Sequence, residues 1–227
     1  MHMRRLRCLG LWITAACAFA GAPTGALAAF AAYTSESAWR DAAGTTALET
    51  FESYAVGTQF SSLPGLGVVF AEVAGGGYPV IYRHFEQNVT PYGSLHLANF
   101  PQGINAINRY APIVMMPADG LVLTALGYYN GDGQAATMVA TAYDSSDNVL
   151  GSIGAFKGAF AGFVSTVPVS RVVFGGITGD GWNHIDGLQS HTAPVPEASA
   201  LSLLAAGLAV LLAVMVPWQQ FRLIRAH

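Results

Sequence analysis

The chain contains very little cysteine. Cys8 and Cys17 are the two cysteines among its 227 residues, and both lie close to the N-terminus. The chain after Cys17 contains no cysteine and therefore cannot form an intramolecular disulfide, even in an oxidising compartment that permits disulfides. A folded domain in this region must be held together by the burial of its apolar side chains.

Charged side chains are also scarce, and basic ones above all. They make up 10% of the chain, whereas hydrophobic residues make up 52%. Between Ala29 and Ala193 there are twelve acidic and five basic residues, which gives this stretch a formal charge of −7. Nucleic-acid binding requires clustered lysine and arginine to neutralise phosphates. The composition therefore excludes a nucleic-acid-binding function.

The sequence motifs of common catalytic sites are absent. There is no Gly-x-Ser-x-Gly motif, and Gly75–Gly77 lacks the Lys and Ser or Thr that complete a phosphate-binding loop. Four histidines are too scattered along the chain for a zinc motif, namely His84, His96, His184 and His191. We expect no catalytic residues and predict that the protein is not an enzyme.

The first 28 residues have the organisation of a secretory signal peptide. Three arginines precede an uncharged stretch from Cys8 to Ala20, and an Ala-x-Ala site follows at Ala26 and Ala28. Two other interpretations are a retained membrane anchor, for which the apolar stretch is short, and a lipoprotein lipidated at Cys17. We predict cleavage near Ala28 and export of the chain that follows.

The C-terminal end carries a long uncharged stretch. Residues 198–216 include no charged side chain, and as a helix they would extend about 28 Å, close to the thickness of the hydrocarbon core. Arg222 and Arg225 follow, and such positive charges stay on the cytoplasmic side. We predict a transmembrane helix over residues 198–216, with the preceding domain on the outer side of the membrane.

The order of features at this end resembles a known sorting signal. Val195, Pro196 and Glu197 precede the apolar stretch, and a short end containing arginine follows it. This arrangement is similar to the PEP-CTERM sorting signal of Gram-negative bacteria. The resemblance implies processing by exosortase, a membrane protease-transpeptidase of genomes that also encode production of extracellular polysaccharide.

The predicted organisation then has three parts. They are a signal peptide (1–28), an exported domain (29–193) and a sorting tail (194–227). Within the tail, the motif covers residues 195–197, the helix 198–216 and the basic end 217–227. We expect the protein to be anchored in the membrane through this helix before sorting, and afterwards to lie at the cell surface or outside the cell.

Between the two ends, the sequence pattern is typical of β-strands. Short apolar stretches rich in Val, Thr, Tyr and Phe are bounded by Gly, Asp, Asn and Pro. The stretch from Ser35 to Gly44 is a helix, with Ser35 as N-cap and Gly44 at its end. We predict a mainly β domain, a single antiparallel jelly-roll-like β-sandwich with a short N-terminal helix. The expected strands are 65–73, 120–129, 136–144, 149–156 and 169–177, and 144–148 is a hairpin turn.

The stretch from Thr50 to Gln189 resembles lectin-like and carbohydrate-binding sandwiches. Such jelly rolls often hold a structural Ca²⁺ between an acidic residue of the first strand and one of the last, which here correspond to Glu52 and Asp186. Calcium prefers such oxygen ligands. The alternative is that both carboxylates end their strands in solvent.

Aromatic residues suggest a ligand-binding site on this domain. Tyr78, Tyr82 and Tyr92 lie in one long segment, while Trp182 and His184 lie in another. Sugars stack on exposed aromatic faces, and polar side chains fix their orientation. The alternative is that these rings close the ends of the core.

These observations predict a non-enzymatic protein of the cell surface or extracellular matrix that binds extracellular polysaccharide. Its expected partners are exosortase and, through the C-terminal helix, the membrane. One alternative is a structural or adhesive protein that binds another protein. Another is a hydrolase with a site that follows none of the known motifs.

Overall fold

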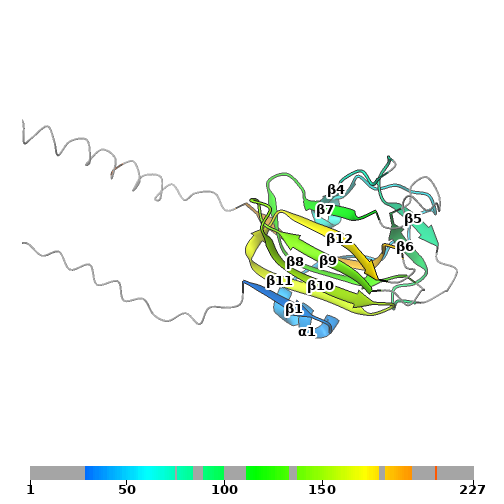
Figure 1. Ribbon diagram of the computed structural model, residues 1–227, viewed down its shortest axis with the longest axis horizontal. Coiled ribbons are helices and arrows are strands. Elements are labelled where there is room, and N and C mark those ends of the chain that lie inside the picture. Colours follow the sequence, from blue (N-terminus) through cyan, green and yellow to red (C-terminus); the bar gives the residue numbers. More distant parts are fainter. Residues whose placement is uncertain are drawn as a thin grey trace, which may run out of the picture.

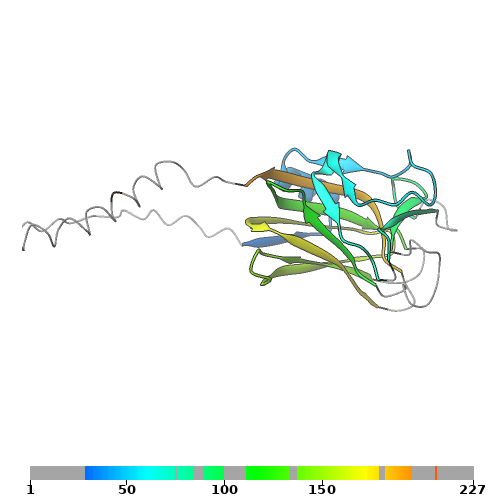
Figure 2. The ribbon, with the colours of Figure 1, turned by 90° about the horizontal axis from the view of Figure 1, so that it is seen from above.

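The computed structural model describes residues 29–74, 76–83, 89–99, 111–132, 137–178 and 182–195, together with Leu208. These residues form two antiparallel sheets that lie face to face, with helix α1 (Glu36–Ala43) on the outer side of the larger sheet (Figures 1 and 2). The predicted mainly β fold is confirmed, and so are the β-sandwich and the N-terminal helix.

The larger sheet, sheet A, has seven strands and the smaller one, sheet B, has six. Sheet A runs in the order β1 (Phe30–Tyr33), β11 (Phe160–Val169), β8 (Leu121–Asn130), β13 (His184–Pro194), β6 (Leu95–Ala98) and β5 (Val80–Arg83), while β2 (Ala47–Glu49) pairs with β13. Sheet B runs in the order β10 (Val149–Phe156), β9 (Thr137–Tyr143), β12 (Arg171–Thr178), β7 (Ile113–Pro117), β4 (Val68–Phe70) and β3 (Ser62–Leu63). A 3₁₀ turn, η1 (Pro64–Leu66), lies between β3 and β4.

The hydrophobic core fills the space between the two sheets. Alternate residues of β9 point inward, so that Met138, Ala140 and Ala142 are fully buried, while the residues between them are only partly buried. From the opposite sheet, Leu97 and Ile185 join the same cluster. This alternation fixes which face of sheet A remains outside, and the candidate site lies on that outer face.

Strand β13 is the last strand among the described residues and yet lies in the middle of sheet A. It pairs with β8 along most of its length, and with β6 and β2 on its other side. It begins at His184 and ends at Pro194, so its two ends are about 33 Å apart at the usual rise per residue. The features at its two ends are described separately below.

Helix α1 is fixed by its caps and by one buried ring. The Ser35 hydroxyl accepts a hydrogen bond from the Ala38 N–H at 3.4 Å, and the Gly44 N–H donates to the Arg40 carbonyl at 3.0 Å. Trp39 is fully buried, and its indole N–H donates to the Phe163 carbonyl at 2.9 Å. The helix is thereby anchored on the outer face of sheet A, over β11 and β8.

Several other sequence predictions match the structure closely. The stretches predicted at 149–156, 136–144 and 120–129 form β10, β9 and β8, and Asp144 closes the hairpin by accepting hydrogen bonds from Ser146 and Asn148. The stretch at 65–73 is a correction, because η1 occupies its beginning and only Val68–Phe70 is a strand. Pro64 favours this turn because its ring sets φ for the first helical position.

Both ends of the chain lie largely outside the described residues. This applies to the predicted signal peptide with Ala26 and Ala28, and to the tail from Pro196 and Glu197 to Arg222 and Arg225, apart from Leu208. Searched over the part of the chain that the structure describes, no helix has the length and hydropathy of a membrane span.

Candidate functional site

A group of aromatic and imidazole rings lies on the outer face of sheet A, on strands β5, β6 and β13. Tyr82 and His96 are direct cross-strand partners, and His184 pairs with Ala98 two residues along β6. Residues two apart on a strand share a face, so the three rings project from the same side of the sheet. The side chains that alternate with them, including Ile81 and Leu97, belong to the core.

These rings contact one another. The centroid of the His184 ring lies 5.4 Å from that of Tyr82 and 5.9 Å from that of His96. Trp182 and Tyr82 both pack against Val80 and Ala98, and both remain partly exposed. We call Tyr82, His96, Trp182 and His184 the histidine cluster. His96 and His184 are buried, so the exposed part of the cluster consists of the Tyr82 and Trp182 rings.

His96 reaches its position because a glycine lies opposite. A Cβ atom at Gly131 would collide with the imidazole ring of His96. The next residue, Asp132, is fully buried, and its carboxylate accepts a hydrogen bond from the backbone N–H of Trp182 at 2.6 Å. Its own N–H donates to the Asn130 side-chain oxygen at 3.0 Å. Gly131 thus leaves room for the His96 ring, and Asp132 holds the backbone at Trp182.

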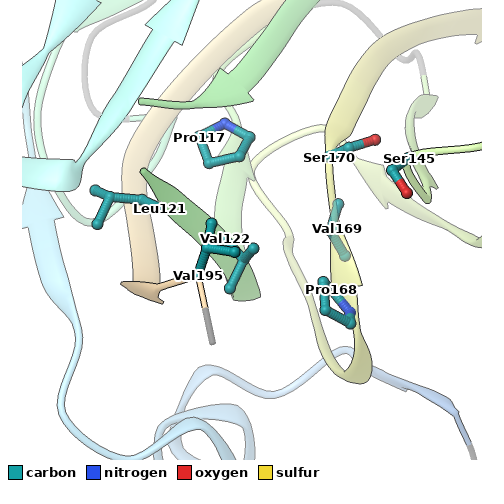
Figure 3. A pocket seen from close by; sticks show the side chains of 8 residues that line it. All are labelled: Pro117, Leu121, Val122, Ser145, Pro168, Val169, Ser170 and Val195. Atoms are coloured by element: carbon teal, nitrogen blue, oxygen red, sulfur yellow. The ribbon is translucent and has the colours of Figure 1, made fainter. Parts of the chain in front are cut away.

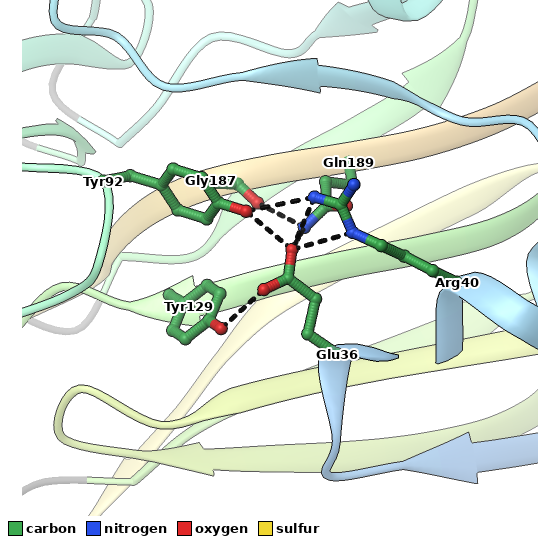
Figure 4. Close-up of polar contacts among 6 residues, drawn as sticks. All are labelled: Glu36, Arg40, Tyr92, Tyr129, Gly187 and Gln189. Atoms are coloured by element: carbon green, nitrogen blue, oxygen red, sulfur yellow. Dashed lines mark hydrogen bonds and ion pairs between the residues drawn. The ribbon is translucent and has the colours of Figure 1, made fainter. Parts of the chain in front are cut away.

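A second polar group lies between α1 and sheet A, around the carboxylate of Glu36 (Figure 4). Its Oε1 accepts hydrogen bonds from Tyr92 at 2.6 Å, from the Gln189 amide at 2.7 Å, and from the Arg40 guanidinium at 2.6 and 3.0 Å. Its Oε2 accepts one from Tyr129 at 2.8 Å. One side chain of the helix is therefore joined to β8, to β13 and to the segment before β6.

These donors change the acidity of the groups involved. Burial alone would raise the pKa of Glu36, but the hydrogen bonds from Tyr92, Tyr129, Arg40 and Gln189 together outweigh it and lower the pKa to about 2. Burial and the hydrogen bond to Glu36 raise the pKa of Tyr92 and of Tyr129. At neutral pH, Glu36 is charged and the two tyrosines keep the protons that they donate to it.

Glu52 holds the start of β6. Its Oε1 accepts hydrogen bonds from the backbone N–H groups of Ser94 at 2.8 Å and Leu95 at 2.7 Å. Glu52 was expected on the first strand, either as a Ca²⁺ ligand or at a solvated strand end. It lies on no strand, because residues 51–57 form turns after β2. Glu52 therefore fixes the start of β6 by accepting hydrogen bonds from two backbone N–H groups.

Asp186 holds the other end of the same short segment. It is fully buried, and its carboxylate accepts hydrogen bonds from the Thr90 hydroxyl and, at 2.7 Å, from the Gly187 N–H. Gly187 has a positive φ of 50°, and a side chain at this position would collide with the Tyr92 ring. Asp186 therefore lies inside the fold rather than at a solvated strand end.

Three carboxylates thus hold residues 90–95, which we call the 90–95 turn. Asp186 binds Thr90, Glu36 binds Tyr92, and Glu52 binds the backbone at its end. Burial raises the pKa of Asp186 to about 7, and the neighbouring charge of Glu52 contributes in the same direction.

The fit to calcium is partial. Ca²⁺ takes six to eight oxygen ligands, and among the described residues no three His, Cys, Asp or Glu side chains are grouped so that they could hold a metal ion. Glu52 and Asp186 would supply two carboxylates, and the Thr90 hydroxyl, which is bonded to Asp186, would supply a further oxygen. Both carboxylates already accept hydrogen bonds from the protein, so a bound ion would have to replace some of these.

The structure brings together three of the five residues predicted to bind a ligand. Tyr82, Trp182 and His184 belong to the histidine cluster. Tyr92 lies instead beside Tyr129, with ring centroids 5.6 Å apart, and serves the Glu36 group. Tyr78 precedes β5, where its N–H donates to the Gln59 side chain at 3.0 Å.

Two central residues of the site were not predicted. His96 lies between two leucines in a strand, and this single polar residue in an apolar alternation is the signal that marks it. Glu36 stands at the first turn of a helix, where an acidic residue is ordinary. Only the fold shows that four donors converge on it.

The chain matches no protein-family model, no curated protein and no solved structure. The functional argument therefore depends on the residues and contacts described above.

Proposed function

We propose that this chain is an exported, non-enzymatic protein of the cell surface or extracellular matrix, and that its sandwich binds polysaccharide through the histidine cluster. The observations that support this proposal are two. Tyr82 and Trp182 are both partly exposed and pack against the same residues, Val80 and Ala98, and the buried His184 ring lies 5.4 Å from the Tyr82 ring. Aromatic faces stack on sugar rings, and fixed polar groups orient them. The jelly-roll and lectin-like resemblance points to the same class of ligand.

A hydrolytic function has less support from the same residues. A carboxyl group with a raised pKa, such as Asp186, is what a general acid requires. However, Asp186 is fully buried and bonded to Thr90 and Gly187, so a polymeric substrate has no access to it. We propose that Glu52 and Asp186 have a structural role and hold a Ca²⁺ ion when calcium is present.

The proposal includes sorting by a PEP-CTERM-like tail. Val195 is the first motif residue, and it follows directly on the last strand of the sandwich. Pro196 and Glu197 would then lie between the domain and the membrane, within reach of exosortase, and the uncharged residues 198–216 would retain the protein until it is processed.

The ligand-binding part is tested with the full-length chain in mild detergent, against the polysaccharide secreted by the cells that produce it. Trp182→Ala and Tyr82→Ala should each weaken binding by about tenfold or more, because each removes a stacking face. Phe156→Ala is the matched control, since Phe156 is an aromatic residue of sheet B that is 54% exposed. Equal affinity of all three variants would contradict the proposed site.

The sorting part is tested in cells that contain an exosortase. Glu197→Ala should leave the exported protein in the membrane at full length, whereas wild type should be shortened within the tail. Fractionation and a mass measurement of the mature C-terminus distinguish the two results. Wild type that also stays at full length would mean that the tail is a plain anchor.

A second candidate function is adhesion to another protein. Strand β10 forms an edge of sheet B, and it exposes two large apolar side chains, Val149 (61%) and Phe156 (54%). Edge strands with exposed apolar residues are available for pairing with another chain. Loss of a protein partner in Phe156→Ala, with polysaccharide binding absent from wild type, would favour this function.

A further inference from the structure

An apolar pocket lies beside Val195 (Figure 3). Val195 follows the last residue of β13, whereas His184 of the histidine cluster is its first, so the two sites lie at opposite ends of this strand. The volume of the pocket is about 350 Å³, and two serines, Ser145 and Ser170, complete its wall. The remaining lining is apolar and comes from both sheets: Pro117, Leu121, Val122, Pro168, Val169 and Val195. This volume is at the lower end of the range for small-molecule sites, and the lining suits a hydrocarbon.

None of the residues that line the pocket carries a charge. Charged residues that adjoin the lining in sequence are mostly acidic: Asp119 before β8, Asp144 and Asp147 in the hairpin, and Arg171 after Ser170. Arg171 is already paired with Asp147 at 3.2 Å. The surroundings therefore offer no excess positive charge to an anionic headgroup or phosphate.

The C-terminal end of the described domain lies in the pocket wall, and the N-terminal end is hydrogen-bonded to β11, a strand that also lines the pocket. The Val195 N–H donates to the Gly120 carbonyl at 2.9 Å, and Val195 itself is half-exposed in the pocket wall. At the other terminus, the Ala29 carbonyl accepts a hydrogen bond from the Thr166 N–H at 3.1 Å, two residues before Pro168 of the lining. The chain therefore leaves the sandwich at the rim of the pocket.

The length of chain beyond Val195 sets how far this end is from the membrane. Only Pro196 and Glu197 separate Val195 from the uncharged stretch that begins at Ala198. Fully extended, such a connection spans about 11 Å at most. A sandwich anchored through residues 198–216 therefore has its pocket within about one headgroup layer of the hydrocarbon.

We infer that the pocket binds an acyl chain of the membrane lipids, so that the anchored sandwich stands on the bilayer with this end. The inference rests on the proposed membrane tail. Its occupant is lipid because hydrocarbon lies within reach of the short connection, and because the lining is apolar and uncharged. The histidine cluster, at the far end of β13, then faces away from the membrane, where a polysaccharide would lie.

The test uses the full-length chain in phosphatidylcholine vesicles, with Cys8 and Cys17 replaced by serine and a fluorophore attached at Val122→Cys. Lipids brominated along their acyl chains should quench most of this fluorescence. The same label at Phe156→Cys should keep its fluorescence, because β10 carries Phe156 away from the hairpin that lines the pocket. Ser145→Cys, an exposed position of the pocket wall, repeats the measurement if the first variant folds poorly.

Flotation of the same vesicles separates the two proposals. Protein that floats with the vesicles but shows no quenching at Val122 or Ser145 would overturn the lipid pocket and leave the membrane tail standing. Protein that does not float would overturn the tail and the pocket together. A third outcome is a label that neither aqueous iodide nor the brominated lipids quench. The pocket would then be covered by a second copy of the chain, and this would also overturn the inference.

Discussion

Tyr92 donates its phenolic hydrogen to Glu36 over 2.6 Å, across 56 residues of sequence. The same carboxylate receives hydrogen bonds from Tyr129 and Gln189, which belong to two neighbouring strands. Glu36 therefore joins the helix, the sheet and the 90–95 turn at one point. Its side chain is mostly buried, so these bonds are stronger than they would be in water.

Replacement of Glu36 by Gln should lower the free energy of unfolding by about 1–3 kcal/mol, because charge-assisted hydrogen bonds become neutral ones and some donors lose their acceptor. Urea unfolding at neutral pH measures the change. Asp41→Asn is the control, since it removes the same charge from an exposed position of the same helix. An equal effect of both substitutions would mean that the loss comes from helix charge alone.

The low pKa of Glu36 predicts a loss of stability in acid. Its pKa is about 2 in the folded chain and 4.5 as the ordinary value, so the unfolded state takes up the proton first as the pH falls. The contribution is fully present above about pH 4.5 and is lost as the pH falls through about 2. The difference in unfolding free energy between wild type and Glu36→Gln should therefore shrink over this range. A constant difference would contradict the assignment.

The raised pKa of Asp186 predicts the opposite pH dependence, a loss of stability as the pH rises. Its pKa is about 7 in the folded chain against an ordinary 3.8, so between these values the unfolded state gives up its proton while the folded state keeps it. The free energy of unfolding should then decline as the pH rises from about 4 to about 7, and level off above that. Asp186→Asn should remove the decline, as followed by urea unfolding at a series of pH values. A profile unchanged from that of wild type would show that Asp186 does not titrate in this range.

If Glu52 and Asp186 share a calcium ion, the ion should offset the stability that is lost when Asp186 ionises. Free calcium at 100 times the dissociation constant stabilises the native state by about 2.7 kcal/mol through mass action. The midpoint temperature of thermal unfolding should therefore be higher with calcium than with chelator for wild type. For Asp186→Asn the two midpoints should be equal. The difference for wild type should grow as the pH rises towards 7, because the proton and the ion compete for the same carboxylate. No effect of chelator on wild type at any pH would remove calcium from this account.

The elements predicted correctly are those whose signals are local. Ser35 and Gly44 mark the ends of α1 by their capping chemistry, and Asp144 marks its hairpin through hydrogen bonds that span four residues. The stretch at 149–156 is a short, mostly apolar segment that follows the Asp144 hairpin, and it forms β10 with those same bounds. None of these assignments needs knowledge of what packs against the element.

Strand β13 was predicted only in part, as the last strand, which carries Asp186, within a resemblance that ends at Gln189. The sequence "HIDGLQSHTAP" contains a glycine, a charge and several polar residues, and resembles a loop. Its polar side chains are tolerated in a central strand because the fold supplies partners for them. Thr90 binds Asp186, Glu36 binds Gln189, and the Leu66 carbonyl accepts from Ser190. Such partners come from distant segments, so local propensity does not reveal that the strand continues to Pro194.

The same reason limits prediction of the site. Tyr82, Trp182 and His184 were singled out by residue type, and their meeting depends on the register of β5, β6 and β13. His96 joins them through that register alone. Tyr92 has the same chemistry as Tyr82, but the 90–95 turn directs it to Glu36. Composition identifies the kind of side chain, and topology decides which ones meet.

The central place of β13 also determines when this protein acquires its structure. Until residues 184–194 have been synthesised, no strand connects β8 with β6. The strands β1, β11 and β8 then remain separate from β6 and β5. A nascent chain therefore lacks the pairing that closes the sheet until almost the whole domain has been synthesised. Pairings between distant segments also form slowly. If the chain is exported unfolded, as proposed above, sheet A would stay open until the last described strand has been synthesised, and folding would be completed after translocation.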